Sequence, residues 1–339
     1  MLIPAFQLRL GDKIYGPQVA TLVLRRARLP ATDRLEVRLP SAAAVSAAPG
    51  DEVSLELDGG EGSQTVFTGR VALIRRRFDA VEVVARGGAD RLAHARPVLA
   101  LAKVTAGEAI RRLADAAGVA VAEVAGGPTL AVYALDGRAT ALAEVARLAA
   151  FTGATAFLDG EGRLVVSDPA VPAEPLPLRY GREILEAEAT EGEDSGPAPV
   201  VTGEGGDPGG EQARWIIADF NRGSPPATDA PRVAMPELRT RADAQAAAAA
   251  IANASRARAR AVRLTTFLIP GIAPGTRLAI AQMPGTVNLA QATVHQVQHS
   301  VTADGMALTR LWGTGFEGGG GLLDSLVGAV AGAVGGALS

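Results

Sequence analysis

The sequence predicts an α+β protein that is mainly β, with a β-rich amino-terminal unit, a small α+β insert, a second β-rich unit and a glycine-rich apolar carboxy-terminal tail. Three observations carry this prediction. Apolar and polar residues alternate in many short runs, two amphipathic helical patterns stand close together, and glycines and prolines separate the blocks. The chain has 339 residues, enough for two or three domains with cores of their own.

Strict alternation marks the first unit, for which we expect the bounds 1–97. The run Arg34 to Leu39 alternates, and residues 50–93 hold four alternating blocks with glycine-rich turns between them. A period of two predicts strands with one buried face. The first unit should therefore be all β.

Two helices and a hairpin are predicted in the insert, residues 98–169. Thr105 and Glu108 form a capping box, followed by apolar residues at helical spacing as far as Gly118. The second helix should begin at about Thr140 and end at Gly153. The hairpin has strands at 154–158 and 163–167 around an Asp-Gly-Glu-Gly turn. We expect Leu113 and Leu148, one from each helix, to be buried.

Prolines and glycines also mark the linker before the second β-rich unit, 176–316, and a loop within it. Residues 169–177 contain four prolines and should form an extended linker, and 192–210 lacks periodicity and should be a surface loop. Residues 215–220 predict a short strand. The alanine-rich run near 240–261 predicts a helix whose small-residue face can lie close against a sheet.

Several motifs, in this order, make the chain resemble the phage late control protein D family. These are baseplate hub proteins of contractile tails, related to the amino-terminal half of VgrG spikes. The resemblance covers roughly Pro4 to Phe316. It rests on a "lf.G.v" strand at 67–71, a polar and leucine step at 89–92, the "dG.GRLvvsdP" hairpin ending at Pro169, a "l.yG.ni" strand at 178–184, and two closing segments at 267–281 and 294–313.

The resemblance implies a contractile-tail hub fold, in which the two β-rich units are barrel-like. It further implies a homotrimeric structural adapter between a hexameric tail tube and a trimeric spike. The partners would be a separate spike protein, the tube protein and other baseplate proteins. Assembly would take place in the cytoplasm of the producing cell. An infectious phage, a tailocin and an extracellular injection system all remain open.

Composition favours a structural role. The formal net charge is −3, which gives no sign of nucleic-acid recognition, and aromatic residues make up only 4%. Cysteine is absent, which excludes disulfides and thiolate catalysis. No nucleotide-binding, nucleophile-elbow or zinc-protease motif is present, so we expect no enzyme activity and no cofactor. The amino terminus lacks a signal-peptide pattern.

The candidate metal ligands of the sequence are its three histidines, His94, His295 and His299. If residues 294–301 form a strand, His295 and His299 point to one face about 13 Å apart, too far to share an ion. A helix would bring them together, but the surrounding pattern is β, and no acidic third ligand is near. We therefore expect no metal site.

The tail, 317–339, is the feature that the hub resemblance explains least. Four glycines precede an apolar run whose only charge is Asp324, and Gly328, Gly332 and Gly336 recur at intervals of four. On a helix such a stripe allows close approach, so these glycines are the predicted sites of tail self-association or partner contact. An apolar tail ordered by a neighbouring protein, a three-helix plug on the particle axis and direct membrane contact are the alternatives. The run is shorter than the roughly 20 residues that span a bilayer.

Two rival functions stay open. One is a cell-wall or polysaccharide hydrolase on a β-rich scaffold, which would need carboxylates converging in a cleft. The other is a membrane-active effector delivered by an injection machine, for which the tail is the only support.

Overall fold

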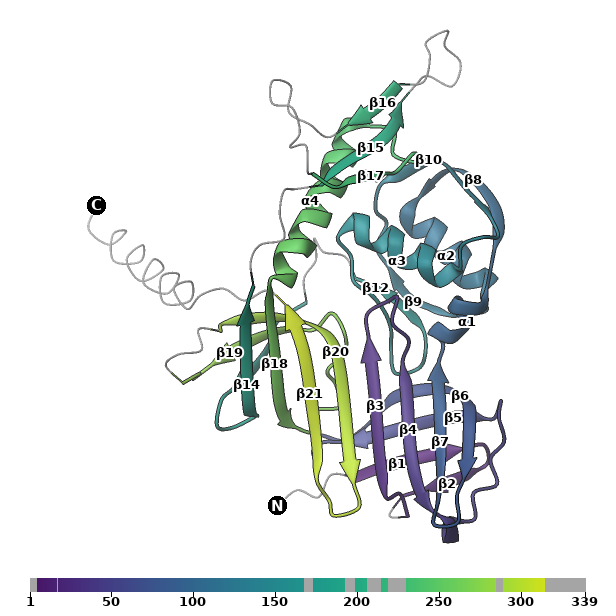
Figure 1. Cartoon of the computed structure of the whole chain (residues 1–339), viewed down its shortest axis with the longest axis vertical. Coiled ribbons are helices and arrows are strands. Elements are labelled where there is room, and N and C mark those ends of the chain that lie inside the picture. The colour runs from purple at the N-terminus through teal and green to yellow at the C-terminus, as the bar shows by residue number, and fades with distance from the viewer. Residues whose placement is uncertain are drawn as a thin grey trace, which may run out of the picture.

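The computed structural model describes residues 5–16, 18–167, 173–192, 199–205, 215–218, 230–284 and 289–314. Over these residues, two barrel-like units of curled sheet lie side by side at one end of the molecule. A lobe of helices and short strands lies at the other end (Figure 1). The fold is thus α+β and mainly β, as predicted.

The first barrel is an antiparallel sheet in the order β3-β4-β7-β6-β5-β1-β2. Its interior is filled by aliphatic side chains such as Leu8, Leu24 and Leu55, and β4 shows the strict burial alternation that its sequence predicts. The elements are β1 (Ala5–Leu10), β2 (Lys13–Tyr15), β3 (Thr21–Ala27), β4 (Arg34–Pro40), the 3₁₀ turn η1 (Ser41–Ala43), β5 (Glu52–Asp58), β6 (Ser63–Arg76) and β7 (Ala80–Gly87).

Two details of this unit differ from the sequence prediction. The four expected blocks form only three strands, β5, β6 and β7, and Gly69 lies inside β6, as the predicted strand over 67–71 requires. A Cβ at Gly69 would stand 2.2 Å from the carbonyl oxygen of Arg86 on β7, so only glycine permits this pairing. The unit is also not all β, since the polar and leucine step at 89–92 lies in a short helix, α1 (Ala89–His94).

The second barrel has its own apolar core, and its sheet is continuous with that of the first. β20 pairs with β3, which joins both barrels into one 13-stranded sheet. No sequence signal pointed to this pairing. The strands are β13 (Leu176–Arg179), β14 (Ile184–Glu191), β18 (Arg260–Phe267), β19 (Arg277–Ala281), β20 (Gln291–Thr302) and β21 (Ala307–Thr314).

The insert contains the two predicted helices and the predicted hairpin. Both halves of the Thr105–Glu108 capping box are present, and Gly153 ends the second helix with φ 75°, in the left-handed region. A two-stranded ribbon, β8 with β10, was not predicted. The elements are β8 (Val98–Thr105), α2 (Ala106–Ala116), β9 (Val121–Val124), β10 (Thr129–Asp136), α3 (Ala141–Thr152), β11 (Ala156–Leu158) and β12 (Leu164–Val166).

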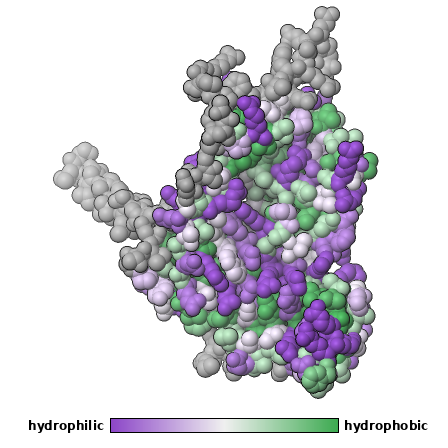
Figure 2. Space-filling model, in the orientation of Figure 1, coloured by the Kyte–Doolittle hydropathy of each residue, from purple (hydrophilic) through white to green (hydrophobic). Residues whose placement is uncertain are grey.

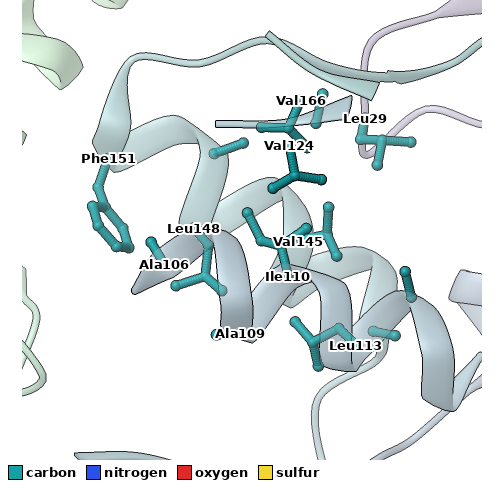
Figure 3. Packing of buried hydrophobic residues seen from close by; sticks show 14 of the residues in the cluster. Leu29, Ala106, Ala109, Ile110, Leu113, Val124, Val145, Leu148, Phe151 and Val166 are labelled. Carbon is teal, nitrogen blue, oxygen red and sulfur yellow. The ribbon is translucent and has the colours of Figure 1, made fainter. Parts of the chain in front are cut away.

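Large aliphatic side chains fill the core of the insert (Figure 3). Leu113 and Leu148 are fully buried there, as predicted. Leu29, from the turn between β3 and β4, enters the same cluster, and its backbone N–H donates to the carbonyl of Ala156 at 2.7 Å. The insert is therefore anchored on the first barrel.

A third unit completes the lobe with β15 (Val200–Gly205), β16 (Trp215–Ala218), β17 (Arg232–Ala234) and α4 (Arg241–Arg258). We use "lobe" for this unit together with the insert. The buried residues of α4 are alanines, and they share one core with the insert. The predicted helix is therefore present, and it packs against α3 as well as against the strands β15, β16 and β18. The domain bounds 1–97, 98–169, 176–316 and 317–339 stay predictions.

Candidate functional site

The predicted tail contacts cannot be placed. Gly328, Gly332 and Gly336 lie outside the described residues, which end at Thr314. The candidate site must therefore be built from the barrels and the lobe.

The three histidines lie in separate surroundings. His94 is exposed at the end of α1, with Nδ1 2.7 Å from the carbonyl oxygen of Asp90. His295 and His299 are both on β20, but a bulge between Val294 and Gln296 shifts the strand register. Beyond this bulge, buried and less buried positions no longer alternate strictly along the strand. The prediction that both histidines point to one face assumed an unbroken alternation, which β20 does not have.

His299 is part of the sheet interior. Its Nδ1 lies 3.0 Å from Oγ1 of Thr309 on β21, and its Nε2 has no hydrogen-bond partner among the described residues. Burial, with a smaller contribution from the nearby Arg26 guanidinium, lowers the pKa of His299 to about 3. The imidazole is therefore neutral at physiological pH and serves the core.

His295 instead faces a cleft of about 840 Å³ where the barrels meet the lobe. One wall comes from α3 and α4 and is made mostly of alanines, including Ala150, Ala250 and Ala254. The opposite wall comes from the ends of β19, β20 and β21, and the turn after β3 closes the bottom. Hydrophilic side chains gather over this middle part of the molecule (Figure 2).

Four basic side chains line the cleft: Arg28, Arg258, Arg277 and His295. Among the described lining residues there is no aspartate or glutamate. Arg28 is held beside His295 because its backbone N–H donates to the His295 carbonyl at 2.9 Å. Within the described part of the chain, neither Arg28 nor Arg258 forms an ion pair, whereas Arg277 lies 3.5 Å from the amide oxygen of Gln291.

The electrostatics of the cleft follow from this excess of positive charge. Burial, and then repulsion from Arg258, lowers the pKa of Arg28. Burial, and then the charges of Arg28 and Arg258, lowers the pKa of His295 to about 4. Both ring nitrogens of His295 are shielded from solvent without a partner among the described residues. The cleft therefore has a positive potential that the described side chains do not neutralise.

Ion pairs and hydrogen bonds around Arg147 hold together the two helices, α3 and α4, that form one wall of the cleft. Arg147 on α3 donates to Glu144 at 2.9 Å and also to Glu237, in the segment that leads into α4. Tyr133 on β10 donates its hydroxyl to Glu144 at 2.9 Å. These bonds hold the insert and the α4 unit together behind the cleft.

A second, smaller hollow of about 270 Å³ lies on the outer face of β1, β5 and β6. It holds Glu52 and Glu56, which stand four residues apart on one strand and thus about 13 Å apart. Paired carboxylates of glycosidases stand about 5 to 9.5 Å apart. This hollow therefore lacks the geometry that the hydrolase hypothesis needs.

Two further properties of the described residues bear on the alternatives. No group of three or more histidine, aspartate or glutamate side chains there is arranged to hold a metal ion. No helix in the same residues is both long and apolar enough to cross a membrane.

The cleft was not visible in the sequence because its residues come from distant segments. The one available signal was the repetition of arginine at 256, 258 and 260, which the helix prediction treated only as the end of a helix.

Comparison with solved structures identifies the fold. A tail protein from Neisseria meningitidis MC58 superposes with a TM-score of 0.68 at 18% identity, over 93% of this chain and 97% of that one. The 43 kDa tail protein of prophage MuSo2 from Shewanella oneidensis gives a TM-score of 0.67 at 14% identity, over 91% and 98% of the two chains.

A third structure comes from a secretion machine. It is the Escherichia coli c3393 protein, a type VI secretion component described as similar to the bacteriophage T4 tail proteins gp27 and gp5. Its TM-score is 0.57 at 11% identity, over 88% of this chain and 74% of that one. No family model and no curated protein matches the chain. At the level of the fold, these likenesses confirm the resemblance to tail hub proteins.

Proposed function

We propose that this chain is a structural component of the baseplate in a contractile phage tail or a phage-tail-like injection particle. The observation that carries the proposal is the pair of barrel-like units joined edge to edge in one sheet, in a fold shared with tail proteins. The role is mechanical, so no catalytic residue and no cofactor is assigned.

The finer proposal is a homotrimeric adapter. Three chains, each with two barrels, would place six barrel units in a ring below a hexameric tube, and the same three chains would meet a trimeric spike. Closed rotational symmetry of this kind is the usual form of homo-oligomers. The partners would be the tube protein, a separate spike protein and other baseplate proteins, with assembly in the producing cell.

The tail has a place in this proposal. Three copies near one axis would bring the glycines at 328, 332 and 336 together or against the spike, where small residues permit close contact. A membrane role for the tail is the less favoured alternative.

Electron microscopy of particles from the producing cell tests the proposal. We expect a threefold map with three copies of this chain between tube and spike. Any other copy number would contradict the trimer, and absence of the chain from purified particles would contradict the baseplate role altogether.

A separate experiment tests the tail. Replacing both Gly328 and Gly332 by leucine should impair spike attachment or assembly while the barrels and lobe stay folded. Fully active particles from a chain ending at Gly318 would show that the tail has no such role.

A further inference from the structure

We propose that the cleft between the barrels and the lobe binds an acidic segment of another polypeptide chain. This inference does not depend on the proposed function, because it rests only on the charge, burial and shape of the cleft.

Charge is the first argument. Arg28, Arg258 and Arg277 approach one cavity, and no carboxylate among its described lining residues offsets them. Arg258 stands in the last turn of α4, where the helix carbonyls favour a cation. Like charges held together in a partly buried cavity are unfavourable, so an anion that enters relieves repulsion as well as forming new bonds.

His295 is the second, independent argument. The bulge in β20 places its imidazole at the cavity, with both ring nitrogens removed from solvent and without a protein partner in the described part of the chain. Buried polar atoms of native proteins are nearly always hydrogen-bonded, so an unpartnered pair at a cavity wall points to a missing ligand group. The neutral imidazole has one N–H to donate, so a carboxylate that accepts from it and from Arg28 would partner one of the two nitrogens.

The shape and the remaining walls favour a polypeptide over a nucleic acid. The described lining contains no phenylalanine, tyrosine or tryptophan on which a base could stack. The alanine walls of α3 and α4 are apolar, and they suit the aliphatic part of a glutamate side chain. Threonine and amide side chains, such as Thr293 and Asn253, can bond to a peptide backbone.

The position of the cleft gives such binding a consequence. Its walls belong to the first barrel, the insert, α4 and the second barrel, so a segment seated there would contact all four. Occupancy would therefore strengthen the attachment of the lobe to the barrels.

Fluorescence anisotropy with a fluorescein-labelled hexaglutamate peptide and the full chain, at low ionic strength, tests the proposal. We expect saturable binding that salt weakens, and no binding of a hexalysine peptide. Since a hydrogen bond to a charged group corresponds to about tenfold in affinity, Arg28→Gln with Arg258→Gln should weaken binding about a hundredfold. The double variant should remain folded, because it removes two charges that repel each other.

The matched control is Arg138→Gln with Arg182→Gln, which changes the net charge equally at exposed arginines away from the cleft. This variant should bind the peptide as the parent does. Equal loss in both variants would overturn the proposal, as would failure of the parent chain to bind.

Two further arms identify the occupant. In an NMR titration, with the His295 resonance assigned by His295→Gln, bound hexaglutamate should raise the pKa of His295 from about 4. Stronger competition by hexathymidylate than by unlabelled hexaglutamate would assign the cleft to nucleic acid. The sequence has an acidic run at 188–194, and tighter peptide binding after Glu193→Gln with Asp194→Asn would assign the cleft to that run. Either result would overturn the proposal.

Discussion

The lobe and the paired barrels keep their shape by different means. The barrels are held by one continuous ladder of backbone hydrogen bonds, and the polar side chains buried in them include the neutral His299 and Thr309 and the Arg26–Asp33 pair. Among its described residues, the lobe has three small, separate sheets, and its parts are joined by side chains: leucines within the insert, and the Arg147 network between the insert and α4. The lobe should therefore be more sensitive to side-chain changes, and the barrels more sensitive to acid.

The largest effect is expected from Leu148→Ala, in the core of the lobe. Removing a fully buried leucine should lower the free energy of unfolding by about 2 to 5 kcal/mol. Chemical denaturation followed by circular dichroism measures this loss, and limited proteolysis should cut the lobe before the barrels. Leu73→Ala, at a half-exposed leucine of β6, is the control and should cost much less. Equal losses of unfolding free energy in Leu148→Ala and Leu73→Ala would contradict the prediction that the lobe is the more sensitive to side-chain changes.

Acid should act on the barrels through His299. Because its pKa is lowered to about 3 in the folded chain, its stabilising contribution is complete above about pH 6.5 and is lost as the pH falls towards 3. Each pH unit in this range changes the free energy of unfolding by about 1.4 kcal/mol. Between pH 7 and pH 4, the free energy of unfolding of His299→Gln should therefore fall by about 3 kcal/mol less than that of the parent. Parallel stability curves for the two proteins would contradict this assignment.

The stability contribution of Asp33 should change with pH in the opposite direction to that of His299, because burial raises the pKa of Asp33 to about 6. Its contribution is complete below about pH 4 and is lost as the pH rises through 6, opposite to that of His299. Asp33→Asn should therefore make the acid loss steeper, as measured in the same denaturation series. A shallower acid loss would show that the pKa of Asp33 is not raised.

Arg147→Met tests the ionic network of the lobe. It leaves Glu144 and Glu237 buried without their shared cation, and Arg147 is itself partly exposed, so we expect a loss of about 2 kcal/mol. Adding Glu237→Gln to this variant should restore part of the loss. No recovery in the double variant would mean that packing of the arginine stem, not its charge, matters.

The smallest effect is expected where α4 meets the insert. Ala247→Leu places a large side chain at a buried position and should cost about 1 kcal/mol, whereas Ala246→Leu, at an exposed position of the same helix, should be nearly neutral. Thermal unfolding of the two variants measures the difference. Equal melting temperatures would show that the contact between α4 and the insert can accommodate the larger side chain.

Local signals predicted local structure well. The Thr105–Glu108 capping box, the Gly153 helix end and the hairpin after it depend on residues a few positions apart, and all three are present. The β8–β10 ribbon was missed because its two strands flank α2 and β9, so neither has its partner as a sequence neighbour.

The candidate site could not be predicted for the same reason. The cleft depends on the bulge at His295, on the turn after β3 and on the last turn of α4, which no local pattern brings together. The same limit applies to Gly69, whose role in close strand packing is visible only once β7 lies beside it.

The pairing of β20 with β3 has a consequence for the order of folding. Arg25 and Gln298 bond to each other although 273 positions separate them, so β3 can gain its full pairing with this neighbour only after Thr302 has been synthesised. Contacts of such long sequence separation slow folding, and until they form, an unpaired strand edge is open to other chains. The emerging chain therefore passes through a period in which its first barrel can join the wrong partner, and the pairing of β20 with β3 ends that period.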